Sequence, residues 1–139
     1  MRKIEIEFFV PGPPVGKERA RVSRAGAYTP AKTKKYERHV RSCAGVAFMQ
    51  DTLADYNPDG WFVLDLSIGH ATGVFPDADN VVKAISDALS GVVWTNDKRV
   101  IPRVWYVGTG HGIDGCGVFV SIRMAVGGEY RENKKEKAK

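Results

Sequence analysis

A period-two alternation over residues 61–69 constrains the fold more than any other feature of this sequence. Every second residue there is large and apolar, namely Phe62, Leu64, Leu66 and Ile68. Side chains of a β-strand point alternately to its two faces, so the alternation predicts a strand with one face in the core. Such a strand needs neighbours in a sheet and a layer that covers its apolar face.

The rest of the sequence predicts both the neighbouring strands and the covering layer. Three further stretches are predicted to be strands: residues 4–10, 100–107 and 117–126. Apolar residues at helical spacing predict helices over residues 31–50 and about 79–89, and Gly91 is placed to end the second helix. Residues 15–30 predict an extended basic loop or loose hairpin. We therefore expect a single α+β domain with a mixed β-sheet and two main helices.

Length and composition exclude several classes of protein. Residues 1–126 are expected to form one domain, and the charged residues 127–139 a flexible C-terminal tail. No apolar stretch reaches the roughly 18–20 residues that span a bilayer, and the N-terminus lacks the apolar run of a signal peptide. The two Cys and three His are scattered without ligand spacing, which gives a zinc site no support. We expect a cytoplasmic protein with no membrane partner and no organic cofactor.

Two tryptophans, Trp94 and Trp105, raise the question of stacking on nucleic-acid bases. Both stand in apolar surroundings in the sequence, so we expect them in the core.

Charge is divided unevenly along the chain. The net charge is +5, and residues 1–50 hold eleven Lys and Arg against four Glu. From Asp51 to Asp97 there are eight Asp and a single cation, Lys83. A metal-dependent enzyme that cuts phosphodiesters needs this combination, because cations hold the polyanion and carboxylates hold a divalent ion. Two solvated faces would give the same charge pattern, so the motifs have to decide.

Three aspartates stand around the second predicted helix. Asp77 and Asp79 bracket its start, and Asp97 comes just before the next strand, where a loop can bring it back over the helix. Mg²⁺ prefers oxygen ligands and keeps several waters, so two or three carboxylates suffice. Lys83 can stabilise charge that develops on a phosphate or orient the attacking water. The alternative is that Asp79 is only a helix cap and Asp97 a turn residue. Lys83 would then form no more than a surface ion pair with Asp87.

Three short motifs follow one another in this region: P-D-A-D-N-V-V-K at residues 76–83, D-A-L-S-G at 87–91 and V-W-T-N-D-K-R-V at 93–100. They are preceded by V-G-K-E-R-A-R at residues 15–21 and Y-T-P at 28–30. The pattern resembles the RusA family of Holliday junction resolvases, in particular its phage and prophage members. That family's signature is D-x-D-N-x-x-K, then D-A-L, then D-D before a strand. The resemblance covers most of residues 4–125.

The resemblance implies a homodimeric, RusA-like crossover junction endodeoxyribonuclease that resolves four-way DNA junctions by paired symmetric nicks. It also implies a dependence on Mg²⁺, with Mn²⁺ as a substitute. The metal-binding catalytic residues carried over by position would be Asp77, Asp79 and Asp97. Lys83 would be the assisting catalytic cation, and two residues, Asn80 and Asp87, would support the helix start.

The sequence departs from the family pattern at two positions. Asn96 stands where members often have the first Asp of the D-D pair, and Ala20 stands where a proline is common in the basic stretch. Asp97 is expected to remain the ligand, so activity should survive. Seven cations are expected to hold backbone phosphates, which positions DNA without reading its sequence. They are Lys17, Arg19, Arg21, Arg24, Lys32, Lys34 and Lys35.

Three alternatives remain open at this point. The first is a less selective metal-dependent nuclease that acts on forks or flaps. The second is a junction-binding module without catalysis, in which the carboxylates only repel misplaced phosphates. The third is a structural domain with a solvated acidic face, which would have no affinity for junctions at moderate salt.

Overall fold

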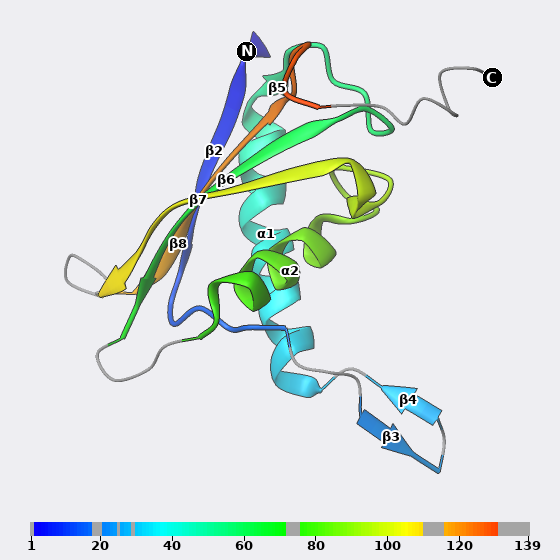
Figure 1. Ribbon diagram of the computed structural model, residues 1–139, viewed down its shortest axis with the longest axis vertical. Coiled ribbons are helices and arrows are strands. Elements are labelled where there is room, and N and C mark those ends of the chain that lie inside the picture. The colour runs from blue at the N-terminus through cyan, green and yellow to red at the C-terminus, as the bar shows by residue number, and fades with distance from the viewer. Residues whose placement is uncertain are drawn as a thin grey trace.

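The computed structural model describes residues 2–17, 21–24, 26–28, 30–71, 76–109 and 116–130. Its centre is a four-stranded sheet in the order β2–β8–β6–β7 (Figure 1). These strands are β2 (Glu5–Pro11), β8 (Gly117–Met124), β6 (Phe62–His70) and β7 (Val100–Thr109). β8 is antiparallel to both β2 and β6, whereas β7 runs parallel to β6 and forms one edge. The mixed sheet of the sequence prediction is therefore confirmed.

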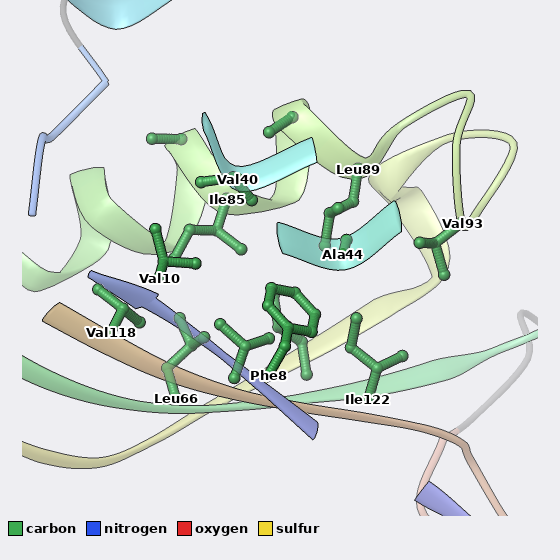
Figure 2. Close-up of a cluster of buried hydrophobic side chains, with 14 of the residues drawn as sticks. Phe8, Val10, Val40, Ala44, Leu66, Ile85, Leu89, Val93, Val118 and Ile122 are labelled. Carbon is green, nitrogen blue, oxygen red and sulfur yellow. The ribbon is translucent and has the colours of Figure 1, made fainter. Parts of the chain in front are cut away.

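Two helices, α1 (Ala31–Gln50) and α2 (Ala78–Leu89), cover one face of this sheet (Figure 1). Apolar side chains from the sheet and from both helices meet between the two layers, as Figure 2 shows. Leu66, Ile85 and Ile122 are at most 1% exposed. Burial of each such side chain stabilises the fold by roughly 1.5–3 kcal/mol. Among the described residues, no helix is long and apolar enough to cross a membrane.

The ends of α2 follow from its local sequence. Asp77 is the N-cap residue, and the helix ends before Gly91, whose φ is +80°. Glycine adopts this left-handed conformation without a steric cost, so the prediction that Gly91 ends the helix is confirmed. α2 connects the parallel strands β6 and β7, and it returns the chain across the covered face of the sheet.

The smaller elements lie around this core. β1 (Arg2–Lys3) pairs in parallel with β5 (Thr52–Leu53). β3 (Arg21–Ser23) and β4 (Gly26–Tyr28) form an antiparallel pair, which confirms the hairpin alternative for residues 15–30 (Figure 1). A short 3-10 helix, η1 (Asp97–Arg99), leads directly into β7.

Within the described part of the chain, no helix covers the other face of the sheet (Figure 1). One row across the four strands consists of Phe9, Phe119, Ser67 and Tyr106. Phe9, Phe119 and Tyr106 are each between 43% and 50% exposed. This face therefore presents aromatic surface to solvent.

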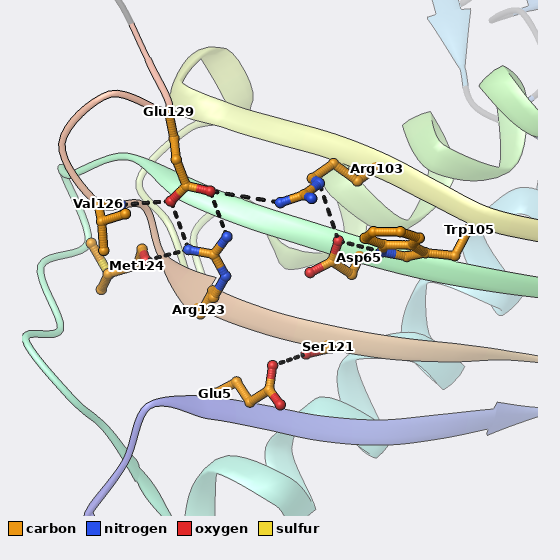
Figure 3. Close-up of polar contacts among 9 residues, drawn as sticks. All are labelled: Glu5, Asp65, Arg103, Trp105, Ser121, Arg123, Met124, Val126 and Glu129. Carbon is orange, nitrogen blue, oxygen red and sulfur yellow. Dashed lines mark hydrogen bonds and ion pairs between the residues drawn. The ribbon is translucent and has the colours of Figure 1, made fainter.

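The chain after β8 covers one end of this face. The Glu129 carboxylate accepts a hydrogen bond from Arg123 at 2.7 Å and lies 3.6 Å from the Arg103 guanidinium (Figure 3). Val63 points to this face yet is fully buried, although the alternation in the sequence placed it outside. The predicted tail begins at residue 127, and the described residues end at Tyr130.

The two tryptophans, Trp94 and Trp105, differ in their exposure to solvent. Trp94 is 1% exposed and belongs to the core, as predicted. The prediction for Trp105 was wrong, because this side chain is 66% exposed on the edge strand β7. The pairing register with β6 shifts between Leu66 and Ser67, so Trp105 is the extra residue of a β-bulge. A bulge redirects its side chain, and no local sequence pattern marks one.

Candidate active site

Two of the predicted metal ligands lie at the start of α2. The Oδ1 atom of Asp77 accepts a hydrogen bond from the backbone N–H of Asp79 at 2.9 Å. Both side chains are exposed. A carboxylate at the N-cap satisfies a free N–H group and interacts favourably with the positive end of the helix dipole. The cap is Asp77, so a capping role does not account for Asp79.

The third predicted ligand, Asp97, lies beside the other end of α2. Its carboxyl group is within hydrogen-bonding reach of that of Asp87, which lies in the third turn of the helix. Burial raises the pKa of the Asp87 carboxyl and the nearby Asp97 raises it further, whereas Lys17 lowers it. Asn96 caps η1, because its Oδ1 accepts from the N–H of Lys98 at 3.0 Å. The residue that departs from the family pattern thus holds the turn that carries Asp97.

The structure does not bring the three predicted ligands of one chain together. Asp79 and Asp87 are eight residues apart on α2, which corresponds to about 12 Å along the helix axis. Asp97 is at the Asp87 end. Within the described ranges, no three His, Cys, Asp or Glu residues are close enough to hold a metal ion. The carboxylates of one chain therefore form two separate pairs, Asp77 with Asp79 and Asp87 with Asp97.

Lys83 lies between the two pairs. It is exposed, four residues after Asp79 and four before Asp87, so the three side chains lie roughly on one side of α2. We call Asp79, Lys83, Asp87 and Asp97 the acidic stripe. The sequence alternative gave Lys83 a surface ion pair with Asp87. Among the described residues, Asp87 forms its ion pair with Lys17 instead, at 3.3 Å.

The segment before β3 crosses the first turn of α2. The backbone N–H of Lys17 donates to the carbonyl oxygen of Asn80 at 2.8 Å. A Cβ added at Gly16 would lie 3.0 Å from the Cβ of Asn80, so the two backbones are closely packed. Asn80 therefore meets this segment through its backbone carbonyl and its Cβ.

Sequence reasoning missed one residue of this region, Glu37 on α1. The Nζ atom of Lys17 lies 2.7 Å from Glu37 Oε1, so Lys17 joins α1 to α2. A lone Glu in a basic stretch gives no signal for such a contact, whereas Asp87 was marked by its place in the D-A-L motif.

The other predicted DNA contacts are distributed over the hairpin and α1. Lys32, Lys34 and Lys35 are exposed at the start of α1, and Arg24 is exposed between β3 and β4. Of the remaining predicted DNA contacts, Arg21 lies in β3, and Arg19 lies outside the described residues.

The donor chemistry of the four aspartates fits a hard divalent cation. Carboxylate oxygens are the ligands that Mg²⁺ prefers, and it is commonly held by one or two of them together with waters and substrate phosphate. The direct contact of two carboxyl groups at Asp87 and Asp97 is an arrangement that an added cation would stabilise. Asp77, Asp79, Asp87 and Asp97 are thus the residues that could hold such an ion.

Comparison with known proteins agrees with this chemistry. The family model described as Endodeoxyribonuclease RusA matches residues 11–58 and 63–123, which is more than half of the chain. The matched ranges include α1, α2, β7 and all of β6 except its first residue, and with them both aspartate pairs. The comparison with curated proteins gives no match. The chain belongs to the RusA family of endodeoxyribonucleases.

Proposed function

We propose that this protein is a magnesium-dependent crossover junction endodeoxyribonuclease that resolves four-way DNA junctions by paired symmetric nicks. The observation that supports this proposal is the acidic stripe, in which Asp79, Lys83 and Asp87 of the family signature lie along one side of α2 with Asp97 beside them. A module that only binds DNA has no need for exposed carboxylates beside its basic surface, because they repel phosphate.

Asp77, Asp79 and Asp97 would hold the metal ion. When bound, Mg²⁺ would polarise the scissile phosphate and make a water molecule a stronger nucleophile. Lys83, which is exposed in the middle of the stripe, would stabilise the negative charge that develops on the phosphate. Mn²⁺ would substitute, since it accepts the same oxygen ligands.

The exposed cations would hold the DNA backbone. Lys32, Lys34 and Lys35 lie on the first turns of α1, with Arg24 on the β3–β4 hairpin. Arg19 and Arg21 would add to this surface from the same basic segment. Such contacts give affinity that falls with salt, and they carry little sequence information.

A second copy of the chain would pair with the edge strand β7. Val104, Trp105, Tyr106 and Val107 are consecutive on this edge and between 41% and 66% exposed. An exposed apolar edge strand can pair with a strand of another chain. Two copies related by a twofold axis would present the same strand to each other, β7 against β7 in antiparallel pairing.

Antiparallel pairing of β7 would also account for the separation of the two aspartate pairs. His70 at the end of β6 pairs with Thr109 at the end of β7, and from His70 the chain leads to the start of α2. In an antiparallel β7 pair, the start of one strand lies beside the end of the other. Asp97 of one copy would then approach Asp77 and Asp79 of the other.

The substrate class is tested with a panel of end-labelled DNAs of equal length: a four-way junction, a replication fork, a flap and a linear duplex. The proposal predicts symmetric nicks in the junction and little cleavage of the duplex, in Mg²⁺ and in Mn²⁺. Equal cleavage of fork, flap and junction would favour the less selective nuclease. Tight junction binding in EDTA without nicks in Mg²⁺ would instead favour the junction-binding module without catalysis.

A further inference from the structure

Lys17 differs from the other basic residues because its ammonium group is used inside the protein. Its Nζ atom lies 2.7 Å from Glu37 Oε1 on α1 and 3.3 Å from Asp87 Oδ2 on α2. The side chains of Lys17, Glu37 and Asp87 are only 20%, 14% and 26% exposed. An ammonium group shared between two carboxylates at this depth is poorly placed to meet a DNA phosphate.

Electrostatics favour this internal position. Burial by itself would lower the pKa of Lys17, but the hydrogen bonds and charges of Glu37 and Asp87 raise it overall. The lysine is therefore charged at neutral pH. Without it, Glu37 would keep Arg41 at 3.9 Å, whereas Asp87 would lose the ion pair that it forms within the described residues.

The backbone of Lys17 is fixed as well. Its N–H donates to the Asn80 carbonyl at 2.8 Å, and Gly16 leaves no room for a side chain against Asn80. Both ends of the residue are therefore attached to α2, the backbone at the first turn and the ammonium group at the third. This double attachment sets where the ammonium group meets Asp87.

Asp87 connects this lysine to the proposed metal ligands. Its Oδ2 atom lies 3.3 Å from Lys17 Nζ, and its carboxyl group is also within hydrogen-bonding reach of that of Asp97. We propose that Lys17 is a positioning residue, which holds Asp87 against Asp97 and thereby orients Asp97, and that it does not bind DNA phosphate. This proposal rests on the proposed function, in which Asp97 is a metal ligand.

Two substitutions and a control test the proposal. Lys17→Met removes the charge and keeps much of the side-chain volume, whereas Lys17→Arg keeps a cation that can reach both carboxylates. Lys3→Met is the matched control, because Lys3 forms a similar ion pair with Asp51 at 3.3 Å away from α2. Circular dichroism melting of each variant establishes that it is folded. If Lys17→Met does not fold, Glu37→Gln tests the same proposal, because it removes the charge of the carboxylate that pairs with Lys17.

The first readout uses neither DNA nor activity. Mn²⁺ binding is followed by electron paramagnetic resonance of the free ion. Groups that orient a metal ligand typically contribute about 10–100-fold to affinity, so we expect Lys17→Met to weaken Mn²⁺ binding roughly tenfold. Lys17→Arg is expected to restore most of the affinity, and Lys3→Met to leave it unchanged. Unchanged or tighter Mn²⁺ binding by Lys17→Met would overturn the positioning role.

The second readout separates positioning from DNA contact. Junction affinity is measured in EDTA over a salt series for the wild type, Lys17→Met and Lys32→Met. A residue that contacts a phosphate contributes about 0.9 to the slope of log affinity against log salt. We expect that slope to fall for Lys32→Met and to stay unchanged for Lys17→Met. A reduced slope for Lys17→Met would show a phosphate contact and contradict the proposal. If the wild type never nicks junctions, the proposed function fails, whereas the Mn²⁺ result still decides the role of Lys17.

Discussion

Asp87, in the third turn of α2, has its carboxyl group within hydrogen-bonding reach of that of Asp97, the first residue of η1. The contact joins a helix that covers the sheet to the turn that starts the edge strand β7. It places Asp97 at the far end of α2 from Asp77 and Asp79. The candidate carboxylates of one chain therefore lie in two separate groups, one toward each end of α2.

Mixed dimers test whether two chains complete one site. Asp79→Asn and Asp97→Asn would each inactivate a homodimer, since each removes a carboxylate from both sites. If Asp97 acts with Asp77 and Asp79 of the other copy, a mixed dimer of the two variants retains one intact site. We expect such a dimer, purified through two different affinity tags, to nick one strand of a junction. A mixed dimer as inactive as its parents would place each site within one chain.

The edge strand β7 is expected to form the dimer contact. Val107→Glu would put a charge on the exposed edge, where Val107 is 45% exposed, and should shift the protein toward a monomer. Sedimentation equilibrium measures the mass. Val46→Glu is the matched control, because Val46 is 60% exposed on α1. Val46→Glu is expected to keep the stability of the wild type to within about 0.5 kcal/mol, whereas Val107→Glu also loses the stabilisation that dimerisation gives. A dimeric Val107→Glu variant would exclude this edge.

Gly16 is expected to tolerate no side chain. Gly16→Ala would put a Cβ 3.0 Å from the Asn80 Cβ, and overpacking of this kind typically costs about 1–3 kcal/mol. Gly45→Ala is the control, since no atom within 4 Å would meet its Cβ and it lies within α1. That substitution should stabilise the protein by about 0.5–1 kcal/mol. Urea unfolding measures both changes, and equal effects at the two positions would mean that the Gly16–Asn80 packing is loose in solution.

Low pH is expected to weaken the contact between Glu129 and Arg123, which covers one end of the open sheet face. Hydrogen bonds from Arg123 and from the Val126 N–H hold the pKa of Glu129 at about 2, below its ordinary value of 4.5. A lowered pKa gives stability that is complete above the ordinary value and is lost as the pH falls toward 2. The melting temperature of Glu129→Gln should therefore lie below that of the wild type at neutral pH and approach it near pH 2.

Glu7→Gln is expected to show the opposite change in melting temperature with pH. Burial and the neighbouring Glu5 raise the pKa of Glu7, so its ionisation opposes folding as the pH rises. This variant should gain in melting temperature relative to the wild type on going from acid to neutral pH. The same pH trend for both variants would contradict the opposite pKa shifts.

Much of the fold could be predicted from periodicity and turn residues. The strand over residues 61–69, the helix that ends at Gly91 and the mixed sheet all depend on patterns within one element. Trp105 could not be placed in this way, because its exposure results from a bulge and from the position of β7 at the edge of the sheet. Both are properties of the whole sheet.

The contacts within the candidate site could not be predicted from local sequence patterns either. The motifs marked Asp77, Asp79 and Asp97, whose spacing in the sequence suggested a common point. The structure instead pairs Asp97 with Asp87, and it directs Lys17 to Glu37 and Asp87. Lys17, Glu37 and Asp87 belong to three separate segments of the chain, which meet where α1 packs against α2. Sequence alone shows that Lys17 is basic, but not which group it faces.

The most direct test is cleavage of an end-labelled four-way junction by the wild type and by Asp79→Asn, in Mg²⁺ and in EDTA. Asp55→Asn is the matched control, because Asp55 is an exposed aspartate whose positive φ of 58° asparagine also adopts. We predict paired symmetric nicks by the wild type and by Asp55→Asn in Mg²⁺ only, and a loss of at least about 100-fold for Asp79→Asn, which keeps junction binding. Nicking by Asp79→Asn at the wild-type rate, or wild-type nicking in EDTA, would contradict a metal-dependent site at the start of α2.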